Sequence, residues 1–347
     1  MIENSILEYL KKKLLNEVNF RLNKKKKILY KVEGSEKIGM GHVFRSFFLT
    51  EKLKKNYDVI IFTENNSKSE KFFKQKKIKL ITHKKIDQFK VFKEIMLNLK
   101  IDTFINDTIF FDKKIFRFLK VNKCKCFFLD TKNILATENF YCINTFIESS
   151  YKHKNLYSGL KYIITDPSLK SRKSYKLNKG IKLLLHFGGT DDRKLNIKII
   201  DVLSKIKNLK KVTIILGPAL NYNRMEIYEK IKKIKLNIKI YNYPEKLTHI
   251  YNSSNLAITN GGNTLFNFCS MNLKNISISA NNLEIKNCKK MKKLKLTNYF
   301  GHYLNFKKKD FIQFYNRIFL QKGFIKNKLL FNGLDEINKI IIKSEIN

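Results

Sequence analysis

The sequence lacks several patterns that define common classes of protein. No apolar run reaches the roughly 18 residues that a membrane-spanning helix needs, and no signal-peptide pattern opens the chain. The five cysteines include no Cys-x-x-Cys pair, and the six histidines show no His-x-x-x-His or His-Glu-x-x-His spacing. We therefore expect a soluble, cytoplasmic protein with buried, reduced thiols and no metal site.

Arginine and acidic residues are scarce beside lysine. The formal net charge is +42, from 71 Lys and Arg residues against 29 Asp and Glu residues, and only seven of the 71 are Arg. The lysines are spread along the whole chain, whereas a nucleic-acid reader concentrates its basic residues and uses Arg for bidentate contacts. We interpret the charge as a solvated coat that attracts anionic substrates, and we expect no specific nucleic-acid partner.

Two series of alternating strands and helices predict the fold. Near-continuous apolar strands separated by helices are typical of a parallel sheet covered on both faces. The expected strands are 28–32, 59–63, 78–82, 103–106, 126–130, 144–147, 182–187, 212–216, 238–241, 256–259 and 276–280. The predicted class is α/β, with two doubly wound Rossmann-like domains over 28–167 and 180–347. Their ligand should lie in the cleft between them, outside the carboxyl ends of the strands.

The pattern of apolar and basic residues in 1–27 predicts a basic amphipathic helix that precedes both domains. Three roles are open for it: packing on the first domain, weak contact with an anionic membrane, or contact with a partner. Packing is the interpretation we favour.

Glycine is rare, and its placement is informative. Six of the 13 glycines form three pairs, each after an expected strand and before a helix: Gly39 and Gly41, Gly188 and Gly189, Gly261 and Gly262. Glycine lets a backbone approach a ligand, and the free N–H groups of a helix start attract negative charge. The third glycine of the dinucleotide fingerprint and the P-loop pattern are both missing, which argues against NAD and P-loop sites.

Small hydrogen-bonding residues follow the second and third pairs: Thr190, Asp191, Asn263 and Thr264. In the third pair, Asn263 or Thr264 could simply cap the next helix. Because two such motifs lie in one half of the chain, we favour ligand binding.

His42 follows the first glycine pair, just before a helix expected from residue 44. Histidine is the side chain most easily poised as a base near neutral pH, and a helix N-terminus disfavours the imidazolium form. His42 is therefore the predicted catalytic base, with a structural, helix-capping histidine as the alternative. Arg45, one turn later, pairs either with a phosphate or with a carboxylate of the fold, and the sequence favours neither.

Together, the Gly39-x-Gly41-His42-x-x-Arg45 element and the two later glycine motifs resemble a known family. They are similar to the nucleotide-sugar hydrolases of the pseudaminic acid pathway, the UDP-2,4-diacetamido-2,4,6-trideoxy-β-L-altropyranose hydrolases, and to GT-B glycosyltransferases such as the peptidoglycan GlcNAc-transferase. The resemblance covers about residues 28–345.

This resemblance implies an activity and a set of site residues. The histidine of the family motif, here His42, activates the water that displaces UDP from the anomeric carbon with inversion. The second-half motifs hold the nucleotide, and Asp107 corresponds to a family Asp over the cleft. The implied protein is a monomeric UDP-sugar hydrolase without cofactor; a glycosyltransferase and a non-catalytic nucleotide-sugar binder are the alternatives.

Three positions depart from the family pattern. Asn267 stands where a Glu usually bonds the ribose, and Leu283 follows Asn282 where a Gln is usual. Lys31-Val32-Glu33 replaces an Arg-x-Asp. We still expect Asn267 and Asn282 to contact the substrate, whose sugar can differ from the family's own.

Overall fold

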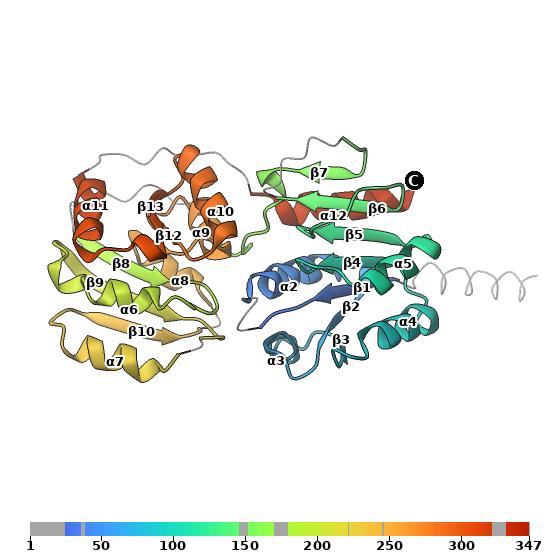
Figure 1. The fold of residues 1–347 in the computed structure, drawn as a ribbon, viewed down its shortest axis with the longest axis horizontal. Coiled ribbons are helices and arrows are strands. Elements are labelled where there is room, and N and C mark those ends of the chain that lie inside the picture. Colours follow the sequence, from blue (N-terminus) through green and yellow to red (C-terminus); the bar gives the residue numbers. More distant parts are fainter. Residues whose placement is uncertain are drawn as a thin grey trace, which may run out of the picture.

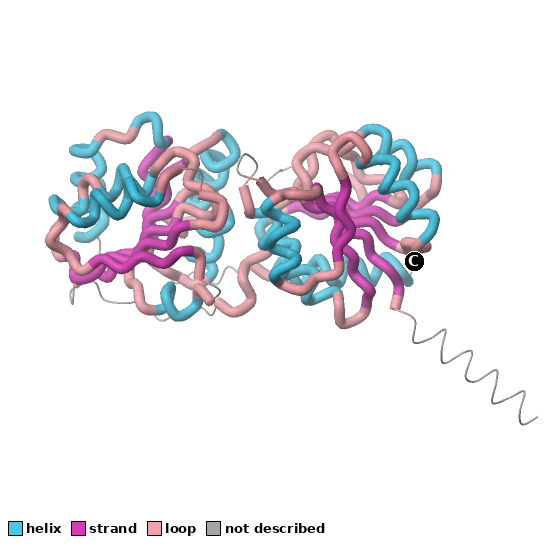
Figure 2. The backbone as a smooth tube through the Cα atoms, turned by 90° about the horizontal axis from the view of Figure 1, so that it is seen from below, coloured by secondary structure: helices cyan, strands magenta, loops and turns pink. Residues whose placement is uncertain are grey.

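A computed structural model describes residues 25–35, 39–145, 152–169, 180–220, 222–244, 246–320 and 331–346. Within them lie two separate parallel sheets, which stand side by side in Figure 1 with the first on the right. Each sheet lies between layers of helices (Figure 2). The prediction of two doubly wound α/β domains is therefore confirmed.

The first sheet has seven strands in the order β3-β2-β1-β4-β5-β6-β7, all paired in parallel. The strands are β1 (Lys26–Val32), β2 (Tyr57–Glu64), β3 (Leu80–His83), β4 (Thr103–Asp107), β5 (Lys125–Leu129), β6 (Phe140–Asn144) and β7 (Leu156–Ser158). The helices between them are α2 (Gly41–Leu53), α3 (Lys68–Gln75), α4 (Gln88–Asn98) and α5 (Lys113–Val121). The chain order reverses between β1 and β4, which is where such sheets bind ligands.

The second sheet has six parallel strands in the order β10-β9-β8-β11-β12-β13. The strands are β8 (Ile181–His186), β9 (Leu209–Leu216), β10 (Ile238–Asn242), β11 (Leu256–Thr259), β12 (Asn275–Ser279) and β13 (Asn298–His302). The helices of this domain are α6 (Leu195–Ile200), α7 (Arg224–Lys232), α8 (Thr248–Asn252), α9 (Asn263–Ser270), α10 (Asn282–Lys293) and α11 (Lys308–Leu320). A last helix, α12 (Gly333–Ile346), follows them along the chain.

Central strands are buried on both faces, and this explains their continuous apolar runs. In β1, Tyr30 and Val32 join the core under α2, whereas Leu29 joins the core on the other face of the sheet. Because side chains alternate along a strand, neighbouring residues of β4 also serve opposite faces. Asp107, the last residue of β4, therefore lies on the same face as Ile105 and α2.

The last helix corrects the predicted domain boundary. α12 belongs to the second half of the sequence but packs on the first sheet, where Ile337, Ile340 and Ile341 join the core with Tyr30 and Val32. Figure 1 shows it beside β5 and β6. The second domain therefore ends before residue 333, because the apolar face of this helix is buried against α2 rather than α11.

Other expectations have mixed outcomes. In place of the strand predicted at 144–147, of which residues 146 and 147 lie outside the described residues, the structure has β6 at Phe140–Asn144, because the apolar run 140–143 is buried in the sheet. Strands β7 and β13 were not predicted.

All five cysteines are free thiols, of which four are buried and Cys124 is partly exposed. No helix among the described residues is long and apolar enough to cross a membrane. The predicted helix at 1–27 lies almost wholly outside the described residues.

Gly217, just after β9, supports the glycine turn that follows β8. A Cβ atom at this position would come within 2.3 Å of the carbonyl oxygens of Gly188 and Gly189. We predict that Gly217→Ala lowers the free energy of unfolding by at least about 2 kcal/mol, because the backbone has to move. Urea unfolding measures this. Gly262→Ala, whose added methyl group meets its nearest atom at 3.7 Å, is the matched control, and an equal loss in both variants would contradict the prediction.

Candidate functional site

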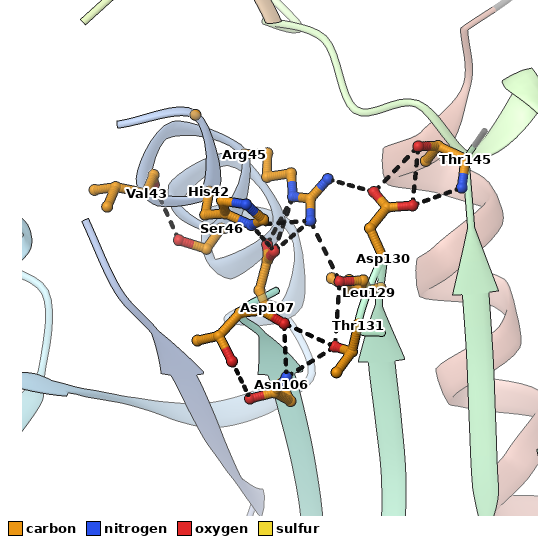
Figure 3. Close-up of polar contacts among 12 residues, drawn as sticks. His42, Val43, Arg45, Ser46, Asn106, Asp107, Leu129, Asp130, Thr131 and Thr145 are labelled. Atoms are coloured by element: carbon orange, nitrogen blue, oxygen red, sulfur yellow. Dashed lines mark hydrogen bonds and ion pairs between the residues drawn. The ribbon is translucent and has the colours of Figure 1, made fainter. Parts of the chain in front are cut away.

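A histidine and a carboxylate meet at the carboxyl end of β4. His42, the second residue of α2, places Nδ1 2.6 Å from Oδ1 of Asp107 (Figure 3). The Asp107 side chain has no exposed surface, whereas 16% of the His42 side chain is exposed. The contact therefore joins a fully buried anion to an imidazole that solvent can reach.

Arg45 lies one turn further along α2 and binds two carboxylates. Its Nε donates to both Asp107 oxygens at 3.0 and 2.9 Å, and Nη2 also donates to Asp107. Nη1 donates to Asp130 Oδ2 at 2.7 Å. The sequence left open whether Arg45 pairs with a phosphate or with a carboxylate of the fold, and in the structure its partners are two carboxylates.

These contacts decide the charge of Asp107. Burial by itself would raise the pKa of this carboxyl group, but Arg45 and His42 outweigh burial and lower it to about 2. Tyr30 adds a third donor, with its hydroxyl group 3.2 Å from Oδ2. Burial raises the pKa of the Tyr30 hydroxyl well above its usual range, so this group stays a donor. Asp107 is thus an acceptor-only anion near neutral pH.

The charge of Asp107 in turn sets the tautomer of His42. An ionised carboxylate can only accept, so the His42 nitrogen that faces it carries the proton. Nη2 of Arg45 lies 3.1 Å from this same nitrogen, and both groups then donate to Asp107. In the neutral imidazole, the lone pair then lies on the other ring nitrogen, Nε2. This arrangement suits a general base whose orientation is fixed by a carboxylate.

The start of α2 also meets the second domain. Asn263 Nδ2, at the start of α9, donates to the carbonyl oxygen of Gly41 at 2.8 Å. A Cβ atom on Gly189 would lie 3.0 Å from Cβ of Met40. The rings of Phe44 and Tyr243 lie 5.7 Å apart. The first glycine loop is therefore in contact with both later glycine loops.

The second-domain loops meet one another as well. A Cβ atom on Gly188 would lie within 4 Å of the side chains of Asn260 and Thr264, and one on Gly262 would contact Asn260. Gly262 is the N-cap residue of helix α9, which therefore begins without a side-chain cap. Its first N–H groups therefore have no cap from a side chain at the point where the glycine turns converge, as an anion site requires.

Glu284 was missed by the sequence analysis. It lies in the first turn of α10, is 8% exposed, and accepts hydrogen bonds from Asn260 Nδ2 at 2.8 Å and from the Ala280 N–H at 2.7 Å. Burial raises its pKa to about 7, and the nearby Asp192 and Asp191 add to the rise. A signal was available, because Glu at the third position after the capping residue Asn281 is typical of a helix start.

Several predicted site residues have structural partners. The Asp191 carboxylate is 6% exposed and accepts bonds from the Leu195 and Asn196 N–H groups and from the Tyr222 hydroxyl, so it holds the turn before α6. Burial raises its pKa to about 6. Asp107 likewise faces the protein interior rather than a ligand.

The other predicted residues of the second domain differ in exposure. Asn267 Oδ1 accepts the Asp166 N–H at 3.1 Å and so binds the segment between the domains. Asn282 is exposed at the start of α10, Thr190 is partly exposed, and Thr264 is buried. Asn282 and Thr190 are thus the more accessible of these residues.

The described residues around this site form no metal-binding cluster, and the cavity found in the first domain lies elsewhere. In the part of the chain that the structure describes, no three His, Cys, Asp or Glu residues are placed to hold a metal ion. A cavity of about 420 Å³ lies at the opposite end of the first sheet, where Lys26, Thr103 and Lys125 begin β1, β4 and β5. It contains none of the residues described above.

Comparison with known proteins shows that part of the chain is similar to a described family of domains. Residues 183–306 match the glycosyltransferase family 28 C-terminal domain. The chain is 27% identical to the uncharacterized protein MJ1062 of Methanocaldococcus jannaschii over 74% of its own length and 56% of that protein. It thus spans little more than half of this relative. It is 22% identical to the spore coat polysaccharide biosynthesis protein SpsG of Bacillus subtilis, over 67% of this chain and 71% of SpsG.

Solved structures show the same fold. MurG of Acinetobacter baumannii superposes with a TM-score of 0.67 at 11% identity, over 92% of this chain and 99% of MurG. Anabaena Alr3699/HepE, solved with UDP and glucose, gives a TM-score of 0.60 at 12% identity, over 93% of this chain and all of HepE (100%). The protein therefore has the GT-B fold and is similar to the GT-B glycosyltransferase-like superfamily.

The raised pKa of Glu284 predicts how stability depends on pH. The pKa rises from 4.5 to about 7 on folding, so the stability that this group contributes is present below pH 4.5 and is lost as the pH rises through 7. The loss amounts to about 3 kcal/mol at most. Glu284→Gln mimics the neutral form, so its stability relative to the wild type should increase from about pH 4.5 to pH 8.

Urea unfolding at the two pH values measures this change. Glu226→Gln, on the outer surface of α7, is the control and should follow the wild type. A constant difference between Glu284→Gln and the wild type across the pH range would show that burial does not perturb Glu284.

Proposed function

We propose that this protein hydrolyses a UDP-linked amino or deoxy sugar at the anomeric C–O bond and releases UDP and the free sugar. Its place would be in the biosynthesis of a nonulosonic acid or a surface polysaccharide. The observation that carries the proposal is the Asp107–His42 pair. In the neutral imidazole, this pair fixes the proton on Nδ1 and leaves the lone pair on Nε2. The imidazole lies at the start of α2, which contacts the uncapped start of α9.

In the proposed reaction, His42 Nε2 removes a proton from water as the water oxygen attacks the anomeric carbon. The bond from that carbon to the diphosphate oxygen breaks, and UDP leaves with the electron pair. Configuration at the anomeric carbon inverts, because water enters opposite the leaving group. Asp107 stabilises the imidazolium that forms and stays ionised throughout.

The nucleotide is assigned to the second domain. In this assignment, Gly188, Gly189 and Gly262 let the backbone approach the diphosphate, and the uncapped start of α9 supplies the favourable end of a helix dipole. Gly261 instead holds the loop in place, because its N–H group binds the Glu284 carboxylate. The wide excess of lysine favours the approach of such an anion. Support for a nucleotide-sugar substrate comes from HepE, which has the same fold and was solved with UDP.

The second candidate function is glycosyl transfer with the same donor. It is favoured by the match of residues 183–306 to a glycosyltransferase domain. The chemistry would be the same except that a sugar hydroxyl takes the place of water. Relationship to SpsG supports polysaccharide biosynthesis for either activity.

Incubation of the purified protein with UDP-amino sugars and no acceptor tests the proposal. We expect equal amounts of UDP and free sugar, measured by anion-exchange chromatography. His42→Asn should lower kcat by about 10²- to 10⁴-fold, the range typical of a general base, while protection against melting by UDP is retained. His249→Asn, at an exposed position of α8, is the matched control.

Three outcomes would contradict the proposal in different ways. Turnover only after an acceptor is added would identify a transferase. Protection by UDP with no turnover of any sugar would favour a binding protein. An unchanged rate in His42→Asn would remove the histidine from the mechanism.

A further inference from the structure

Arg45 is bound to a second carboxylate that the proposed reaction does not use. Asp130 follows β5 and accepts from Arg45 Nη1, whereas Nε and Nη2 donate to Asp107. A guanidinium group is planar and rigid, so carboxylates on two of its edges fix its plane. The two anions stand at the ends of neighbouring strands, β4 and β5.

Asp130 is itself fixed by the next strand. The N–H group of Thr145 donates to its Oδ1 at 2.7 Å, and the Thr145 hydroxyl lies 3.0 and 3.1 Å from its two oxygens. The Asp130 N–H donates to the carbonyl oxygen of Ile143 at 2.9 Å. The backbone of Asp130 has φ of 50°, a conformation that non-glycine residues adopt infrequently. The carboxylate is thus held in place by β6.

These contacts form one continuous chain of hydrogen bonds, Thr145–Asp130–Arg45–Asp107–His42, which Figure 3 shows in full. It runs from the end of β6 past β5 to β4 and α2. Every hydrogen bond in this chain has a charged donor or a charged acceptor, and such bonds are the stronger ones in proteins.

We propose that Asp130, clamped by Thr145, is a positioning residue for the reaction at His42. It holds the Arg45 guanidinium in the one orientation that aligns the Asp107 carboxylate with His42 Nδ1. The inference rests on the proposed function, since it assigns a role in turnover. Its first part, the alignment of His42, concerns the protein without substrate and can be tested separately.

The charges around His42 predict the direction of the effect on pH dependence. The groups facing it are Asp107 from β4 and Arg45 from α2, with Tyr30 from β1 and Asp130 behind them. Asp130→Asn removes one negative charge and leaves the Arg45 charge less compensated. The resulting gain in positive potential disfavours the imidazolium, so the acid limb of kcat/KM against pH should move to lower pH.

The experiment compares Asp130→Asn and Thr145→Val with the wild type and with Thr145→Ser, which keeps the hydroxyl group. We expect kcat on a UDP-amino sugar to fall by about 10- to 100-fold in the first two, with KM little changed, because the imidazole is misaligned. The acid limb should shift only in Asp130→Asn, and Thr145→Ser should restore most of the rate. Wild-type kcat and an unshifted acid limb in Asp130→Asn would overturn the inference and leave the proposed function standing.

Nitrogen NMR of the His42 side chain in the substrate-free protein provides the independent readout. In the wild type, Nδ1 should carry the proton over the neutral range, and in Asp130→Asn the two tautomers should mix. If no sugar is hydrolysed, this measurement still decides the alignment. A lowered melting temperature with unchanged tautomers would show that Asp130 acts on stability alone, and it would overturn the inference.

Discussion

The buried carboxylate of Asp107 is the group on which the candidate site depends. It has no exposed surface, so it exists as an anion only because His42, Arg45 and Tyr30 surround it with donors. Removing one partner of a buried charge leaves the other charge uncompensated, which is costly. One carboxylate thus ties β1, β4 and α2 together and at the same time sets the tautomer of the histidine.

Contact between the domains brings the Asp107–His42 pair next to the glycine loops of the second domain. The start of α2 meets the second domain through the Gly41 carbonyl, Met40 and Phe44. All three glycine pairs therefore lie around one region, with an imidazole on one side and uncapped N–H groups on the other. Glycine is needed here for close approach: a Cβ atom on Gly261 would come within 2.7 Å of Glu284. A base and an anion-binding surface are thus brought together by packing that tolerates few side chains.

Much of the fold could be predicted from the sequence, because strands buried on both faces leave continuous apolar runs. The position of α12 could not, since its amphipathic pattern shows that one face is buried but not against which sheet. The glycine pairs and His42 could be singled out because their local order along the chain carries the signal. Roles for Asp107, Asp191 and Asn267 were less predictable, because a polar residue at the end of a strand, in the turn after it or in the next helix can face either a ligand or the protein. Asp130 was overlooked for the same reason, although it follows β5 directly and thus lies at the ligand-binding edge of the sheet.

The central claim is that His42 activates water for attack on the anomeric carbon of a UDP sugar. The most direct test is to run the reaction in water enriched in the heavy isotope of oxygen and to weigh both products by mass spectrometry. The account predicts that the label enters the sugar at its anomeric hydroxyl and that UDP contains none. Label in the terminal phosphate of UDP would show attack at phosphorus and would contradict the account.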